Sequence, residues 1–254
     1  KPNIYRSQAV LVPQEQSKSS ALGGLGALAG MAGVDLGGGE MSPDGAYQLY
    51  LDDYRWMREF LLRSGLFERI NAADADRNYR FALGFDALYR LTQGGGEKPQ
   101  MDAAEKEKRL FETYQKVKAQ LSVSSDKKTS VITVGYTDPD AQLAKEVVEL
   151  FLKHASESLR RGELSDMDKK IAYYDEELGR TSDLALKTQL SQLMSALIQK
   201  KVLAQSSYYY NVKMVTSPSV AYERDKTGPK RGLIVMVSLI TSLIIGIFGV
   251  FLFE

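Results

Sequence analysis

The four residues Arg55-Trp56-Met57-Arg58 carry the clearest binding chemistry in this sequence. The face of an indole ring stacks on sugar rings, and guanidinium groups hydrogen-bond to sugar hydroxyls or to acidic glycans. Trp56 is the only tryptophan of the chain, and it stands between two arginines on a predicted helix. The pattern predicts either a glycan contact formed by Arg55, Trp56 and Arg58 or a tryptophan that packs between helices.

Residues that could do covalent or metal chemistry are scarce. The chain has no cysteine, which excludes disulfides, zinc fingers and thiol nucleophiles. His154 is the only histidine, so we interpret it as a packing or surface residue. The run GLGALA, residues 24–29, fits the spacing of a dinucleotide fingerprint, but no strand leads directly into it, which favours a loop. The sequence therefore predicts no enzyme, no cofactor and no metal site.

The charges of the chain are balanced. Lysine and arginine total 33 and aspartate and glutamate total 32, for a formal net charge of +1. Binding to nucleic acid draws on an excess of positive charge that releases counterions. Nucleic acid is therefore not an expected partner, and the 254 residues are enough for one or two domains.

Residues 1–137, together with 208–217, predict an α+β base domain. Alternation in residues 3–12 indicates a strand, residues 121–136 indicate two strands around a polar turn, and a last strand is expected near 208–216. The first and last strands bracket the rest of the chain and could pair in one sheet. Between them, Ser42-Pro43-Asp44 begins a helix that should end near Ser64-Gly65.

Residues 138–207 predict one very long helix that protrudes from the base. Asp138-Pro139-Asp140 begins it, and no proline follows until Pro218. At 1.5 Å per residue, a helix of roughly 70 residues is about 100 Å long. Apolar residues recur four and three apart, as in a helix that packs along another helix. The last block of this seam, expected to pack in a homo-oligomer, is Leu186, Leu190, Leu193 and Leu197.

The end of the chain predicts a membrane helix. Residues 232–253 carry no charge and match the roughly 20 residues that span a bilayer. Residues 218–231, with Pro218, Pro229 and Lys230, form the expected linker into this span. Gly246 and Gly249 lie three apart within it and would let another helix approach closely.

Four stretches together resemble the polysaccharide copolymerase family, the Wzz-type chain-length determinants of bacterial inner membranes. The stretches are YRSQAVLV, LGGLGALAGMAG, SVITVGYTDPDAQLAKEVVELF and SPSVAYERDKTGPKRGLIVMVSLITSLIIGIFG. They resemble, in order, the strand after the family's first membrane helix, its Gly/Ala loop, its entry into a long helix and its approach to a second membrane helix. The proline motif of that approach is thinner here than is usual in the family.

The resemblance implies a non-enzymatic regulator of polysaccharide chain length, acting on O-antigen, common antigen or a related glycan. It implies two membrane helices, the first upstream of residue 1, with most of the chain in the periplasm. The implied partners are further copies of the chain in a ring, a lipid-linked glycan polymerase, the nascent glycan and the lipid bilayer. The charge of Lys230 and Arg231 alone would instead place residues 1–229 in the cytoplasm. The alternative function is the ligand-sensing periplasmic domain of a two-span receptor.

Overall fold

The computed structural model describes residues 3–13, 42–81, 102–126, 128–206, 209, 211–222, 226–228 and 231–253. These residues form a mixed α+β structure with a small sheet, and the GLGALA run lies outside them. The elements are β1 (Tyr5–Pro13), α2 (Pro43–Asp52), α3 (Tyr54–Arg63), α4 (Leu66–Phe81), α6 (Ala103–Gln120), β2 (Leu121–Asp126), β3 (Val131–Asp138), α7 (Ala141–Arg180), α8 (Leu184–Ser206), β4 (Val212–Thr216) and α9 (Arg231–Phe253).

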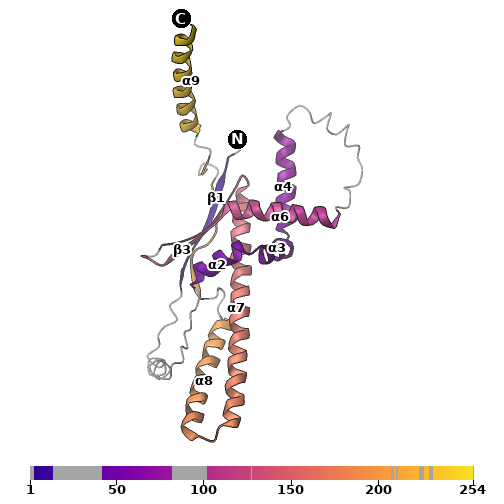
Figure 1. Ribbon diagram of the computed structural model, residues 1–254, viewed down its shortest axis with the longest axis vertical. Coiled ribbons are helices and arrows are strands. Elements are labelled where there is room, and N and C mark those ends of the chain that lie inside the picture. Colours follow the sequence, from indigo (N-terminus) through magenta and orange to yellow (C-terminus); the bar gives the residue numbers. More distant parts are fainter. Residues whose placement is uncertain are drawn as a thin grey trace.

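Strand β1 lies inside the sheet, whose order is β2-β3-β1-β4, and every neighbouring pair is antiparallel. On one side Ala9 is opposite Val134 of β3, and on the other Val12 is opposite Lys213 of β4. The expected pairing of the first and last strands is therefore confirmed. Residues far apart in the sequence thus meet at the first strand (Figure 1).

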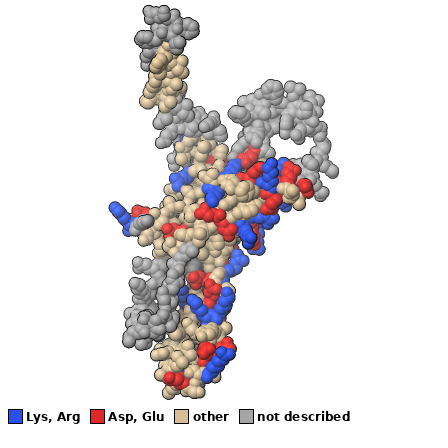
Figure 2. Space-filling model, viewed as in Figure 1, with Lys and Arg blue, Asp and Glu red and all other residues tan. Residues whose placement is uncertain are grey.

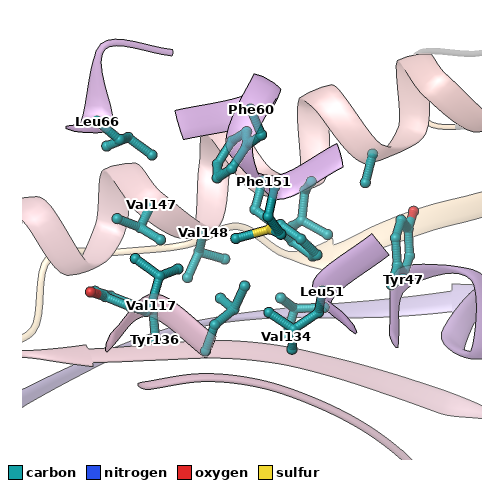
Figure 3. Close-up of a cluster of buried hydrophobic side chains, with 14 of the residues drawn as sticks. Tyr47, Leu51, Phe60, Leu66, Val117, Val134, Tyr136, Val147, Val148 and Phe151 are labelled. Atoms are coloured by element: carbon teal, nitrogen blue, oxygen red, sulfur yellow. The ribbon is translucent and has the colours of Figure 1, made fainter. Parts of the chain in front are cut away.

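The hydrophobic core lies between one face of the sheet and the helices. Ala9 and Leu11 of β1 are fully buried, as expected when alternate side chains of a strand point to the same face. Figure 3 shows this layer from the side, with α7 above the strands. The residues labelled there that join the two layers are Val134, Tyr136, Val147, Val148 and Phe151.

Asp53 separates two helices that the sequence predicted as one. Its backbone is extended, and its Oδ1 accepts a hydrogen bond from the backbone N–H of Arg55 at 2.9 Å. Asp53 thus ends α2 and is the N-cap of α3. Helix α3 ends where expected, at Ser64, and Gly65 then takes φ +69°. That left-handed conformation suits glycine because it has no Cβ, and α4 leaves in a new direction (Figure 1).

The expected single helix over 138–207 is wrong, because the chain reverses at residues 181–183. Helix α7 ends at Arg180, and α8 runs back along it as the second arm of a hairpin (Figure 1). Thr181 is extended and ends α7. Asp183 Oδ1 then accepts hydrogen bonds from the backbone N–H groups of Ala185 at 2.8 Å and Leu186 at 3.4 Å, which satisfies the free donors at the start of α8.

The hairpin is about 60 Å long at 1.5 Å per residue, because its longer arm, α7, has 40 residues. The first half of α7 packs on the sheet, and its second half projects beyond the sheet together with α8. Figure 1 shows the tip of the hairpin at one end of the molecule and α9 at the other. The predicted protrusion of about 100 Å is therefore wrong, because the longer arm is about 60 Å long and only its second half projects beyond the sheet.

The prediction of a transmembrane helix over 232–253 is also wrong. These residues do form a helix, α9. However, within the described part of the chain, no helix meets both the length and the apolar character needed to cross a bilayer.

Candidate functional site

Trp56 lies in a row of aromatic rings where α3 crosses α7. Its ring stacks on Tyr50 at 4.6 Å and on Phe60 at 5.5 Å between centroids, and meets Phe151 edge-on at 5.8 Å. Its Nε1–H donates to Ser158 Oγ at 3.0 Å. The side chain is half-buried and packs against the hydrophobic core.

These contacts use most of what the indole ring offers to a ligand. A sugar ring stacks on a free aromatic face, whereas two neighbouring rings already stack on Trp56. The polar N–H is also engaged, by Ser158. Of the two readings of Trp56, the contacts favour packing between helices.

Arg58, by contrast, points to α6 and binds Glu107. Its Nε donates to both carboxylate oxygens of Glu107, at 2.9 and 3.0 Å. The Tyr54 hydroxyl donates to the same carboxylate at 2.7 Å. Tyr54 and Arg58 are four residues apart and so share one side of α3. Together they tie α3 to α6.

The electrostatics follow from these hydrogen bonds. The Arg58 guanidinium and the Tyr54 hydroxyl both bind the carboxylate and hold the pKa of Glu107 below its usual value. Burial, followed by the hydrogen bond to the Glu107 carboxylate, raises the pKa of Tyr54 to about 12. Glu107 is therefore an anion and Tyr54 a hydrogen-bond donor throughout the neutral range.

An exposed aromatic ring lies next to this cluster. Phe111 follows Glu107 by one turn of α6, and its ring meets Tyr54 edge-on at 5.3 Å. Tyr114, which contacts both rings, is buried. Its hydroxyl group donates a hydrogen bond to the backbone oxygen of Asp52 at 3.0 Å. Phe111 itself remains 48% exposed.

We call Tyr54, Arg58, Glu107 and Phe111 the Phe111 cluster. Arg58 alone of its members was a sequence candidate. The others were missed because the cluster joins residues 49 and 53 positions apart. The four-residue spacing of Tyr54 and Arg58, and of Glu107 and Phe111, was visible in the sequence. Nothing in the sequence indicated that these faces of α3 and α6 meet. Arg55, the third candidate, is exposed one turn before Arg58.

The predicted seam of α8 faces its own chain. Leu190, Leu193 and Leu197 are half-buried, and they lie on the side of α8 that packs along α7. Lys201, near the end of this side, forms an ion pair with Asp168 of α7. Leu186, near the tip, is 42% exposed. Packing of this seam between copies of the chain stays a prediction.

The opposite side of α8 has a second seam, which we call the outer face. Its members are again spaced four and three apart, and all are exposed: Leu184, Thr188, Ser191, Ser195, Ile198 and Val202. No charged residue belongs to it, because the charged residues of α8 are Lys187, Lys200 and Lys201. Figure 2 shows charged side chains of both signs on the α7 side of the hairpin, next to a mostly uncharged α8.

The segment after β4 follows the sheet and is not a free linker. Pro218 is buried, and the carbonyl oxygen of Ser219 accepts a hydrogen bond from Ser7 Oγ at 2.9 Å. Further on, the Ile4 N–H donates to the Gly228 oxygen at 2.9 Å. Gly246 and Gly249 lie within α9, and two other candidates lie outside the described residues, Pro229 and Lys230.

Comparison with known proteins finds similarity to solved structures. No protein-family model matches the chain, and no curated protein matches it. Among solved structures, the chain is similar to a fragment of WzzB, a polysaccharide co-polymerase from Salmonella Typhimurium. The two share 14% identity at a TM-score of 0.39, over 89% of this chain and 100% of that chain. A likeness of this size does not by itself assign a function.

In the described part of the chain, no group of three or more histidine, cysteine, aspartate and glutamate side chains is placed to hold a metal ion. The candidate sites in the described part of the chain are two surfaces, the Phe111 cluster and the outer face of α8.

Proposed function

We propose that this chain regulates the length of a polysaccharide. In this proposal, copies of the chain assemble on the periplasmic side of the inner membrane and form a scaffold around a lipid-linked glycan polymerase. The growing glycan would be a second partner. The chain itself carries out no covalent chemistry. The resemblance of four sequence stretches to the copolymerase family supports the substrate class and the location.

The outer face of α8 is the observation that carries the scaffold proposal. A helix that remains in water normally exposes charged and polar residues on its free side. The outer face instead exposes Leu184, Ile198 and Val202, with three small hydroxyl residues between them. The four-and-three spacing is the pattern of a helix that packs lengthwise against another helix.

A second copy of the hairpin is the occupant that fits this face best. The outer face lies on an arm that projects beyond the sheet (Figure 1), so a neighbouring hairpin can lie beside it. The small side chains of Ser191 and Ser195 at its centre let a second helix approach closely. The charged residues of α7 on the other side of the hairpin, such as Lys169 and Glu176, would remain in water.

The test places a charge on the outer face. The double variant Ile198→Glu, Val202→Glu should convert a large homo-oligomer of the purified protein into smaller species, measured by light scattering at micromolar concentration. In cells, the same variant should broaden or shift the length distribution of the surface polysaccharide. Both side chains are well exposed, so the fold should remain, which circular dichroism can check.

The matched control is Ala172→Glu on the exposed, charged side of α7, which should change neither the assembly nor the glycan. A wild-type protein that is a monodisperse monomer contradicts the scaffold. A polysaccharide whose length is the same with and without the protein contradicts the function as a whole.

A further inference from the structure

We infer that the Phe111 cluster is a sugar-binding site, in which a pyranose ring stacks on Phe111 and its hydroxyl or carboxylate groups are bound by Arg58. This inference deepens the proposed function, because it rests on a glycan being the partner and adds where and how the chain contacts it. The site lies on the base, between α3 and α6, and not on the hairpin (Figure 1).

The first argument is the exposed ring. The Phe111 ring contacts the rings of Tyr54 and Tyr114, with centroids 5.3 and 6.0 Å away, and almost half of its surface remains open. The C–H groups on one face of a pyranose ring are apolar and pack well on a flat aromatic face. Trp56, the ring that the sequence suggested, is by contrast already covered by its neighbours Tyr50 and Phe60.

The second argument is the hydrogen-bonding capacity that remains on Arg58. Its Nε binds Glu107, while its two terminal nitrogens make no hydrogen bond with the described residues. The guanidinium is thus fixed at one edge and keeps its outer fork of N–H groups for a ligand. Such a fork matches the oxygen pair of a carboxylate or of neighbouring sugar hydroxyls.

The third argument is that the cluster is held in place before a ligand arrives. Glu107 receives hydrogen bonds from both Tyr54 and Arg58, and Tyr114 supports Tyr54 from below at 5.3 Å between ring centroids. Few side-chain rotations remain to be lost on binding, which lowers its entropic cost. The exposed Arg55, one turn away, adds a positive charge that suits an acidic sugar.

The experiment measures saturation-transfer NMR from the full-length protein to two probes, maltohexaose and hexagalacturonate. Both carry pyranose rings, and they differ in charge. Transfer to the ring C–H protons of at least one probe is expected. Binding of hexagalacturonate alone identifies an acidic sugar as the preferred ligand, and binding of maltohexaose identifies the hydroxyl groups as sufficient. The absence of transfer to both overturns the inference.

Two variants locate the binding. Phe111→Leu keeps an apolar side chain of similar size and removes the aromatic face, and Arg58→Gln removes the fork. Each should weaken binding at least fivefold. The matched controls are Tyr173→Leu, which removes an exposed aromatic ring on the hairpin, and Arg109→Gln, which removes an exposed arginine of α6 paired with Glu105. Equal binding by wild type and both cluster variants overturns the inference.

Failure of the sugar-binding site and failure of the proposed function give different experimental outcomes. If the probes bind at the Phe111 cluster but loss of the protein leaves polysaccharide length unchanged, the site stands and the proposed function fails. If length depends on the protein while Phe111→Leu and Arg58→Gln bind sugar normally, the function stands and the site fails.

Discussion

Trp56 donates its indole N–H to Ser158 Oγ at 3.0 Å and thereby links α3 to α7. Since the ring also stacks on Tyr50 and Phe60, Trp56→Ala should lower the free energy of unfolding by about 3 kcal/mol, the low end of the range for truncating a buried aromatic residue. Ser158→Ala removes the hydrogen bond alone and should cost about 1 kcal/mol. Urea unfolding measures both, and a stable Trp56→Ala protein with altered glycan length would contradict the packing role.

Two glycines should respond in opposite directions to the same substitution. A Cβ added at Gly65 or at Gly162 meets no atom within 4 Å, so space does not distinguish them. Gly65 has φ +69°, which costs an alanine about 1 kcal/mol, whereas Gly162 lies inside α7, where alanine is favoured by about 1 kcal/mol. Gly65→Ala should therefore lower the melting temperature and Gly162→Ala should raise it. A shift of the same sign in both variants would refute this account.

His154 should lower the free energy of unfolding of the protein in mild acid. Burial lowers its pKa below the usual value, and the positive charges of Lys153, Arg63 and Arg161 act in the same direction, opposed by Glu157. The pKa of His154 is lowered in the folded state and is about 6.5 in the unfolded state. At pH values between these two pKa values, His154 is protonated in the unfolded chain and neutral in the folded protein. Stability is therefore full above about pH 6.5 and falls as the pH drops toward the folded-state pKa.

The measurement compares wild type with His154→Gln by urea unfolding from pH 7.5 to pH 5. Since His154 is the only histidine, the difference between the two proteins isolates its contribution. The stability of wild type relative to the variant should decrease as the pH falls. A relative stability that is constant, or that rises in acid, would show that the imidazole is not held in its neutral form.

The proposed periplasmic location can be tested with an introduced cysteine in the β2–β3 turn. Asp126 is a poor position, because its Oδ1 accepts a hydrogen bond from the backbone N–H of Lys128 at 2.9 Å and shapes the turn. The side chain of Lys128 is exposed, so Lys128→Cys should cost little stability, within about 0.5 kcal/mol. A membrane-impermeant maleimide should label this variant in intact cells.

Val134→Cys is the matched control, because Val134 is fully buried on the neighbouring strand and should be labelled only after unfolding. Labelling of Lys128→Cys that requires permeabilised cells would contradict the periplasmic location, and with it the proposed contact with a glycan polymerised on that side.

The base of the molecule was largely predictable because its signals are local. Alternation in residues 3–12 indicated the strand that became β1, and Asp140 was recognised as part of a helix start. In the structure, Asp140 Oδ1 accepts hydrogen bonds from the backbone N–H groups of Gln142 and Leu143, at 2.8 and 3.3 Å. Such residues determine their own surroundings, so a single sequence is enough to interpret them.

The hairpin was not predictable from its apolar pattern. The four-and-three spacing resumes after the turn, and a period does not show that the chain has reversed direction. Asp183 was the available indication, since aspartate is a preferred N-cap residue. The Phe111 cluster was harder to predict, because the contact between α3 and α6 depends on how both helices pack in the folded core.

The sheet also determines when this protein can fold during its synthesis. Strand β1 is made first, yet its neighbours β3 and β4 begin at Val131 and Val212. A ribosome must therefore synthesise every residue from β1 to β4 before β1 has both partners, and contacts between such distant residues form slowly. Until β4 is made, one edge of β1 has no strand partner, and an unpaired strand edge can pair with another chain.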